Sequence, residues 1–376
     1  MIEVPEIVAL ALVVQGRATG GHAIAVRLRN LPQVRIAQVA PVWFPVPPSG
    51  YGGIELVVSL LTDGLTDAGH DVTLFASGGS RSHAHIVSPL AEPPDPRKLG
   101  SPWYDSYHAL SAYLHEAEFD VIHDHAGVVG PVLGAMLHGR PPVIHTLHGP
   151  WTEESRLLYE LVGQHVHLVA ISDAQRNDGT GIRHLGTVHN GIDLSDYPFR
   201  AADEKDDFLV YIGRANHDKG PVEAIEIARR AGLELTMIVK HNEPLEHAYF
   251  DLEVAPRLGA DIEMLEDVPH EVKVDRLGRA RGMIFPIRWP EPFGLVMVEA
   301  MACGTPVVTT NWGAAPELVD DGVTGFRRDG TDELATAVGR LGELDPLECR
   351  ARVEERFSAA AMVRGYEALY HRVVGA

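Results

Sequence analysis

The sequence predicts an α/β protein with two Rossmann-like domains that face each other across a cleft. From Val34 onward, short β-branched and apolar runs alternate with segments of helical periodicity, a pattern typical of parallel sheets covered by helices. These runs fall into two sets, and the polar segment "RAADEKDD" at residues 200–207 separates them. The length of 376 residues also favours two domains.

The predicted strands can be placed in order along the chain. The first set comprises residues 34–40, 71–77, 120–125, 142–148 and 167–172, and the second comprises residues 207–213, 235–240, 282–287 and 306–310. Between the first two strands, apolar residues recur at the spacing of an amphipathic helix. In open α/β sheets ligands bind beyond the carboxyl ends of the strands, so we expect the site on strand-to-helix loops.

We predict an N-terminal extension over residues 1–33, a first domain over 34–199 and a second domain over 200–356. The apolar run "IVALALVV" at residues 7–14 is too short to span a bilayer and has no basic leader before it. We therefore expect no transmembrane segment.

Charge and cysteine usage limit the function classes. Acidic residues exceed basic ones by 52 to 32, and the net charge of −20 argues against a nucleic acid or an anionic membrane as the main partner. Cys303 and Cys349 are the only cysteines and form no CxxC pair, which predicts a reducing, cytoplasmic location.

The segment "GRANHDKG" at residues 213–220 follows a predicted strand of the second set. It places Arg214 and Lys219 just before a helix. Two cations beside a helix N-terminus suit a diphosphate. An exposed basic turn is the alternative interpretation.

A glycine-rich segment, "PPSGYGGIE" at residues 47–55, takes the equivalent place in the first set. Gly52 and Gly53 can bring backbone N–H groups close to an anion. The dinucleotide fingerprint G-x-G-x-x-G fails, because Glu55 occupies the third glycine position. This disfavours a nicotinamide-dependent dehydrogenase.

The segment "PEPFGLVMVEAMACGTP" places one acid in a loop and another inside an apolar helix. Glu291 lies between two prolines, and Glu299 falls within the periodic stretch 295–302. Both carboxylates can accept hydrogen bonds from sugar hydroxyls. The backbone N–H groups at the start of this helix point toward an anion or a hydroxyl. They belong to Phe293, Gly294 and Leu295.

These motifs, in this order, resemble the retaining family 4 glycosyltransferases of GT-B architecture, also called glycosyl transferases group 1. The resemblance covers residues 34–375 and includes "YGGIE", "DVIHDH", "VIHTLHG", "AISDAQR", "VHNGID", "GR…KG", "EPFGLVMVEAMACGTPVV" and "GAAPELVDDGVTGF". It implies that the first domain is the acceptor side and that the second binds a nucleotide-sugar donor. It also implies a C-terminal helix, residues 357–376, that packs back on the first domain.

The resemblance implies a role for each candidate residue. Arg214 and Lys219 would bind the donor diphosphate, Glu291 the donor-sugar hydroxyls, and Glu299 the ribose. His148, at the end of a first-domain strand, would contact the donor sugar near the reacting carbon. Phe293, Gly294 and Leu295 would offer backbone contacts, and Gly52 and Gly53 would approach the diphosphate when the domains close.

The expected reaction is transfer of a sugar, a hexose by preference, with retention at the anomeric carbon. The chain has no Asp-x-Asp motif, so we predict that it needs no metal and no other cofactor. A rival hypothesis is a metal site built from His123 and His125 with His145 or His148.

Other functions stay open at this stage. They are a sugar-nucleotide epimerase of the same architecture and a non-catalytic sugar-nucleotide-binding subunit. The acceptor class, whether small molecule, saccharide or lipid-linked, also stays open, as does peripheral contact with a membrane.

Overall fold

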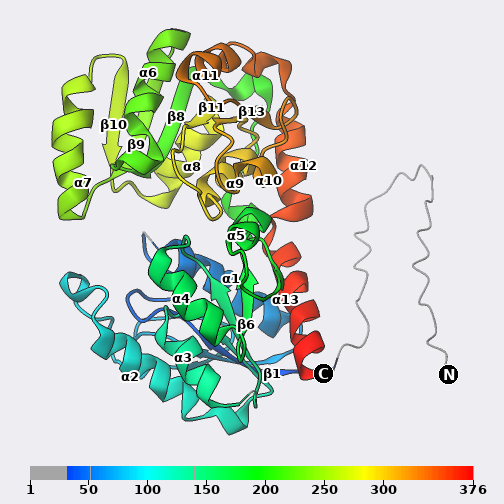
Figure 1. Cartoon of the computed structure of the whole chain (residues 1–376). Coiled ribbons are helices and arrows are strands. Elements are labelled where there is room, and N and C mark those ends of the chain that lie inside the picture. The colour runs from blue at the N-terminus through cyan, green and yellow to red at the C-terminus, as the bar shows by residue number, and fades with distance from the viewer. Residues whose placement is uncertain (1–31, 51, 139, 376) are drawn as a thin grey trace, which may run out of the picture. The chain divides into compact units, whose positions relative to one another are not determined.

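Figure 1 shows the computed structural model of the chain, which describes residues 32–50, 52–138 and 140–375. Apart from its last two residues, the predicted extension over residues 1–33 lies outside the described residues. The domain limits drawn from the sequence stay predictions.

The first half of the described chain forms a parallel sheet. Within the described residues its order is β3 (His85–Val87), β2 (Asp71–Phe75), β1 (Arg35–Val39), β4 (Val121–Asp124), β5 (Val143–Leu147), β6 (His167–Ala170) and β7 (His184–Thr187). The helices of this half are α1 (Gly53–Asp67), α2 (Pro102–Tyr113), α3 (Val129–Met136), α4 (Glu153–Val162) and α5 (Asp173–Asp178). In the β1–β4 register Gln38 lies opposite His123, which places two polar side chains next to each other in the sheet.

The second half forms another parallel sheet. Its order in the described chain is β10 (Ile262–Glu266), β9 (Glu234–Lys240), β8 (Asp206–Arg214), β11 (Ala280–Phe285), β12 (Val307–Thr309) and β13 (Gly325–Arg327). The helices of this half are α6 (Pro221–Ala231), α7 (Pro244–Tyr249), α8 (His270–Arg279), α9 (Leu295–Ala302), α10 (Ala315–Leu318), α11 (Thr331–Val338) and α12 (Pro346–Arg356). Short 3₁₀ and π turns join several of these elements.

The two sheets confirm the predicted fold class, and every predicted strand is present. The prediction missed β3, β7, β10 and β13. β3 and β13 have only three residues each, and β7, "HLGT", includes a histidine and a glycine and no apolar run. β10 is a partly exposed strand whose two exposed positions are both glutamates.

Helix α9 is apolar on almost every face and packs in the core of the second half. All of its residues from Met297 to Ala302 are buried. A helix that is apolar all round belongs in an interior. Glu299 is therefore carried into the core by its neighbours.

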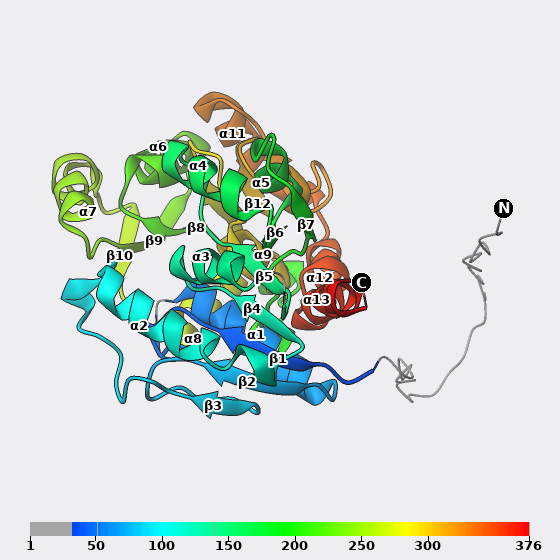
Figure 2. The same cartoon turned by 60° about the horizontal axis from the view of Figure 1, so that its bottom comes forward.

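The C-terminal helix α13 (Ala359–Val374) crosses from the second half to the first. Its predecessor α12 packs against α9, whereas α13 packs against α1 (Figure 1 and Figure 2). Tyr366 and Tyr370 of α13 are buried in the same core cluster as Ile36 of β1 and Val121 of β4. This confirms the predicted crossing helix.

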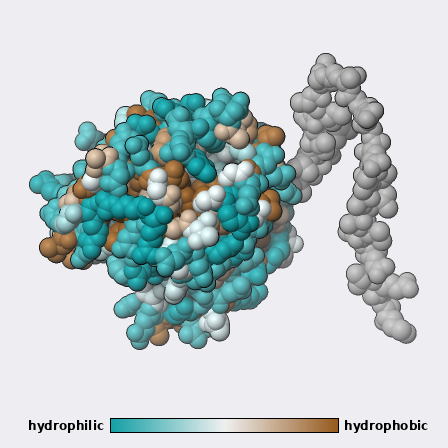
Figure 3. Space-filling model, turned by 90° about the horizontal axis from the view of Figure 1, so that it is seen from above, coloured by the Kyte–Doolittle hydropathy of each residue, from teal (hydrophilic) through white to brown (hydrophobic). Residues whose placement is uncertain are grey.

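Figure 3 shows one face of the described chain. Most of this surface is hydrophilic, and smaller apolar areas lie among the hydrophilic ones. None of the helices in the described ranges combines the length and apolar character needed to cross a membrane.

One carboxylate joins the two halves directly. Glu317 of α10 accepts hydrogen bonds from the backbone N–H groups of Asp173 and Ala174, which begin α5 in the first half. It also lies 3.0 Å from Nε2 of His189. Exposed N–H groups at a helix start attract negative charge, so this contact holds α5 against the second half.

We predict that Glu317→Ala lowers the free energy of unfolding by about 2 kcal/mol, because charge-assisted hydrogen bonds to two N–H groups are lost. Urea-induced unfolding, followed by circular dichroism, measures this as a lower midpoint. The control is Glu343→Ala, which removes an exposed ion pair with Arg340 and should barely change the midpoint. Equal urea midpoints for both variants would contradict a stabilising role of Glu317 at the start of α5.

Candidate active site

The predicted donor-binding residues gather at the carboxyl ends of the second sheet. Arg214 is the last residue of β8, and Lys219 precedes α6. Glu291 lies in the loop after β11, and Glu299 lies in α9. Glu291 and Glu299 are 8% and 4% exposed, so both carboxylates need partners within the protein.

Lys219 is the partner of Glu291. The lysine ammonium forms an ion pair with Oε2 of Glu291 and lies 4.6 Å from the ring centroid of Trp289. The indole N–H of Trp289 donates to the same carboxylate oxygen over 2.9 Å. The sequence assigned Lys219 to phosphate and Glu291 to sugar, whereas this structure pairs them with each other.

Arg214 also has acidic partners. Its Nη1 lies 3.2 Å from Glu246 and 3.5 Å from Glu243, both at the start of α7. The sequence carries no sign of this pairing, because the two acids follow a different strand. Both predicted phosphate-binding cations are thus neutralised by carboxylates.

Glu299 is held by two donors from other elements. Its Oε1 accepts from the hydroxyl of Tyr197 over 2.9 Å and from Lys273 of α8 over 2.8 Å. Burial, with the nearby Glu299 charge, raises the pKa of the Tyr197 hydroxyl, which keeps it a donor. Its other oxygen, Oε2, is buried and has no hydrogen-bond partner in the described part of the chain.

The start of α9 has a conformation that favours glycine. Gly294 has φ 91°, and a Cβ there would come within 2.6 Å of Cε of Met297. Phe293 before it is buried, and Leu295 opens the helix. The first N–H groups of a helix have no partner within it, so this end is suited to an anion or a hydroxyl.

The predicted glycine loop lies beside this helix start. Gly52 has φ 154°, and a Cβ there would lie 2.8 Å from Cβ of Pro48. Gly53 opens α1, and a Cβ on it would lie 3.5 Å from Cδ1 of Leu295. The N-terminal ends of α1, in the first half, and of α9, in the second half, therefore lie next to each other.

His148 follows β5 and is partly exposed. Its Nε2 lies 2.9 Å from Nδ1 of His125. Burial lowers the pKa of His148 to about 3, so its imidazole is neutral at neutral pH.

The other histidines named in the rival metal hypothesis are used in hydrogen bonds. Nδ1 of His145 lies 3.2 Å from Asp124 and its Nε2 lies 3.0 Å from the hydroxyl of Tyr159. His123 lies within hydrogen-bond distance of Thr146 and Tyr370. In the described ranges no group of three or more His, Cys, Asp or Glu side chains is arranged to hold a metal ion.

A cavity of about 50 Å³ lies between the two halves at Glu291. Its lining residues are Pro150, Trp151, Arg156, Gln175 and Asp178 from the first half and Pro290, Glu291, Pro292 and Gly313 from the second. Sequence reasoning missed Trp151 and Arg156. The Arg156 guanidinium lies 5.4 Å from the Trp151 ring centroid and donates to the carbonyl of Asp178 over 2.6 Å.

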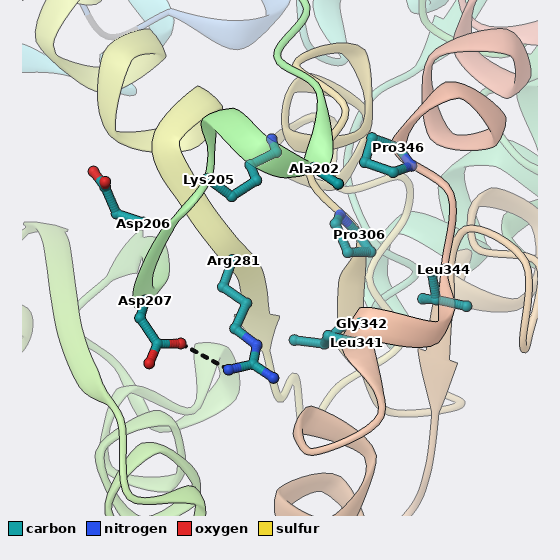
Figure 4. A pocket seen from close by; sticks show the side chains of 10 residues that line it. All are labelled: Ala202, Lys205, Asp206, Asp207, Arg281, Pro306, Leu341, Gly342, Leu344 and Pro346. Carbon is teal, nitrogen blue, oxygen red and sulfur yellow. Dashed lines mark hydrogen bonds and ion pairs between the residues drawn. The ribbon is translucent and has the colours of Figure 1, made fainter.

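A larger cavity, of about 250 Å³, lies at the opposite, amino ends of the second sheet (Figure 4). Its charged groups are already paired: Asp207 with Arg281 at 2.7 Å, and Lys205 with the carbonyl of Gly278 and the hydroxyl of Thr305. The predicted site residues lie at the other ends of the strands. This cavity is therefore separate from the candidate active site.

Two family models match consecutive parts of the chain. The model for "Glycosyltransferase Family 4" matches residues 51–196, and the model for "Glycosyl transferases group 1" matches residues 196–357.

Similar curated proteins and solved structures cover most of the chain. A glycogen synthase of Mycobacterium tuberculosis is 27% identical over 82% of this chain and 86% of its own. A phosphatidyl-myo-inositol mannosyltransferase of Mycolicibacterium smegmatis is 25% identical over 86% of this chain and 89% of its own. The crystal structure of AviGT4, a glycosyltransferase involved in avilamycin A biosynthesis, is 26% identical with a TM-score of 0.69 and covers 91% of this chain and 98% of its own.

Two parallel sheets with a site at their carboxyl ends, together with these likenesses, define a glycosyltransferase of the GT-B fold. The chain belongs to glycosyltransferase family 4. The relatives described above are synthases and transferases, so the epimerase alternative is not favoured.

Glu55 is a further residue near the glycine loop whose environment the sequence did not indicate. It lies in the first turn of α1, is 5% exposed, and its Oε2 lies 3.0 Å from where a Cβ of Gly52 would stand. Burial raises the pKa of Glu55 to about 7.

This raised pKa predicts a pH-dependent stability. The unfolded chain loses the Glu55 proton near its ordinary pKa of 4.5, whereas the folded chain keeps it until about 7, so Glu55 costs stability as pH rises through this window. Glu55→Gln should therefore raise the free energy of unfolding at pH 8 by up to about 3 kcal/mol. At pH 4 it should change little. Urea titrations of both proteins at pH 8 and pH 4 measure this change in the free energy of unfolding. An equal change at the two pH values would contradict the raised pKa of Glu55.

Proposed function

We propose that this chain transfers a hexosyl group from a nucleoside diphosphate sugar to a saccharide, small-molecule or lipid-linked acceptor, with retention and without a metal ion. The observation that carries the proposal is the meeting of the α1 and α9 N-termini beside two Lys–Glu pairs. Helix starts and lysines suit phosphate groups, and buried carboxylates suit sugar hydroxyls. A donor that carries both groups matches this set.

Donor binding would exchange the partners of the charged groups. Lys219 is paired with Glu291, and Arg214 with Glu243 and Glu246. A diphosphate brings negative charge that competes for Lys219 and Arg214. Glu291 would then be released to accept hydrogen bonds from the sugar, and the indole N–H of Trp289 would still donate to its carboxylate.

Glu299 would bind the ribose. Lys273 and Tyr197 occupy one of its oxygens, and the other has no partner in the described chain. A ribose hydroxyl would supply the missing donor, which supports this role because buried acceptors are rarely left unsatisfied.

The chemistry rests on stabilising the leaving group. Arg214, Lys219 and the helix N-termini would stabilise the negative charge that develops on the diphosphate. A double displacement needs a carboxylate nucleophile on the opposite face of the sugar. Two acids of the described first half are buried. Asp124 is already bonded to Ala126, His145 and Tyr113, and the raised pKa of about 7 leaves much of Glu55 protonated. Front-face attack, with the departing phosphate taking the acceptor proton, is therefore the favoured route.

The halves would have to separate to admit the donor. The cavity at Glu291 measures about 50 Å³, whereas ligand pockets for molecules of drug size are typically about 300–1,000 Å³. Domain opening and closure on this scale is common in enzymes that exclude water from a transferred group.

Incubation with a panel of nucleoside diphosphate sugars, with and without saccharide and inositol phosphate acceptors, tests the function. We expect release of nucleoside diphosphate with at least one donor, and the same rate after exhaustive treatment with EDTA, because Arg214 and Lys219 supply the positive charge. No release with any donor would contradict the transferase proposal. Loss of release on chelation, restored by Mn²⁺ or Mg²⁺, would contradict metal independence alone.

Substitution of Glu291 and of Glu299 should affect different quantities, turnover in the first case and nucleotide binding in the second. We expect Glu291→Gln to lower kcat strongly while nucleoside diphosphate affinity changes little, because its partner would be the sugar. Glu299→Gln should weaken nucleoside diphosphate binding by about 1–3 kcal/mol, as for one hydrogen bond to a charged acceptor.

Isothermal titration calorimetry and initial rates measure both effects, with the exposed Glu343→Gln as the control. The reverse pattern, with Glu291→Gln losing affinity and Glu299→Gln binding normally, would overturn the assignment.

A further inference from the structure

A buried chain of hydrogen bonds connects His148 with the C-terminal helix α13. Its members, in order, are His148, His125, Gln38, Tyr370, His123, Thr146 and Tyr366. All except His148 are at most 2% exposed. The chain thus joins strands β4, β1 and β5 to a helix that comes from the other half of the protein.

Gln38 fixes the direction of these hydrogen bonds toward His148. A side-chain amide oxygen only accepts, whereas its nitrogen only donates. Oε1 of Gln38 lies 3.0 Å from Nε2 of His125, so this nitrogen carries a hydrogen. Burial lowers the pKa of His125 well below its ordinary value, so the ring is neutral and its Nδ1 has a lone pair.

The same logic continues to His148. Nδ1 of His125 lies 2.9 Å from Nε2 of His148 and needs a donor there. Nε2 of His148 is therefore the protonated nitrogen. Since this ring is also neutral, its Nδ1 is left as an acceptor, and no hydrogen bond to that atom is found in the described part of the chain.

The other branch runs toward α13 with a consistent direction. Nε2 of Gln38 donates to the Tyr370 hydroxyl over 3.0 Å, and that hydroxyl donates to Nδ1 of His123 over 2.7 Å. Nε2 of His123 then donates to the Thr146 hydroxyl over 2.8 Å, and Thr146 lies 2.8 Å from the Tyr366 hydroxyl. Each donor in this branch therefore faces an acceptor.

We propose that Gln38 is a positioning residue that, through His125, holds His148 in the Nε2–H tautomer, so that its Nδ1 accepts a hydrogen bond from a hydroxyl of the donor sugar. The inference rests on the proposed function and on the role that the resemblance implies for His148, which is contact with the donor sugar. The proposal requires that the donor sugar carries a free hydroxyl at the position that contacts His148. A deoxy sugar at that position lacks the hydrogen that Nδ1 accepts.

The opposite arrangement is chemically distinct. An exchange of the amide nitrogen and oxygen of Gln38 would reverse each hydrogen bond in turn. His125 would then donate to Nε2 of His148, and Nδ1 of His148 would carry the hydrogen. The tautomer of His148 is therefore the decisive measurement.

The first experiment is a long-range ¹H–¹⁵N correlation spectrum of the ligand-free protein labelled with ¹⁵N-histidine. The His148 signals are those lost in His148→Gln. We expect a protonated Nε2 and an unprotonated Nδ1, which resonate far apart. A protonated Nδ1 in His148 would overturn the proposal.

The second experiment compares Gln38→Met with Tyr113→Phe. Gln38→Met keeps the side-chain length but removes the hydrogen bonds to His125, Tyr370 and His123. We expect a second His148 tautomer and a kcat about tenfold lower. Nucleoside diphosphate affinity should stay within about twofold of the native value, because the residues proposed to bind the nucleotide lie outside the chain of hydrogen bonds. Tyr113→Phe removes a buried hydroxyl that bonds to Asp124 outside this chain and should change neither quantity.

Tyr370→Phe provides a second route if Gln38→Met does not fold, because it keeps the ring but removes the nearer of the two partners of the Gln38 amide nitrogen, the other being Nδ1 of His123 at 3.4 Å. It should also produce mixed tautomers. A single native tautomer together with a native kcat in a folded Gln38→Met or Tyr370→Phe protein would overturn the proposal. The spectrum needs no donor, so a protein that turns over a sugar nucleotide with Nδ1–H in His148 refutes this inference and leaves the proposed function intact.

Discussion

The arrangement of the site depends on one constraint: a carboxylate taken out of water must be matched by a cation or by hydrogen-bond donors. Glu291 and Glu299 are both buried, and each is paired with a lysine from a different element. The pairs set the orientation of the loop after β11 and of α9 relative to α8 and the β8 loop. Removing one partner from such a pair leaves a buried charge, whereas exchanging it for another charged group does not. Both carboxylates are therefore matched by a lysine while the site is empty.

The sequence predicts the architecture well because both sheets are parallel and covered by helices, so their strands are continuous apolar runs. The missed strands are those that lack such runs: β3 and β13 are very short, β7 is interrupted by glycine, and β10 contains two exposed glutamates. The crossing of α13 came from the resemblance and not from periodicity. An amphipathic helix shows which face is apolar, but its sequence does not show which sheet that face covers.

Within the candidate site, the sequence alone allows prediction of residues whose type and spacing are unusual, such as Glu291 between two prolines. It does not bring out their partners. Lys273 and Tyr197 lie far from Glu299 in the sequence, and nothing in their local pattern marks them. The same holds for Gln38, which appears as one polar residue in an apolar strand until β1 is placed beside β4. The assigned substrate contacts stay predictions, because their test is a bound donor.

The crossing of α13 has a consequence for the order in which the protein is made. Tyr366, Tyr370 and their neighbours belong to the core of the first half, yet they come after the whole second half along the chain. Domains generally fold as units, and N-terminal ones fold first during synthesis. Here the core of the first sheet includes α13, so the half that is translated first can complete its core only after the second half has also been synthesised.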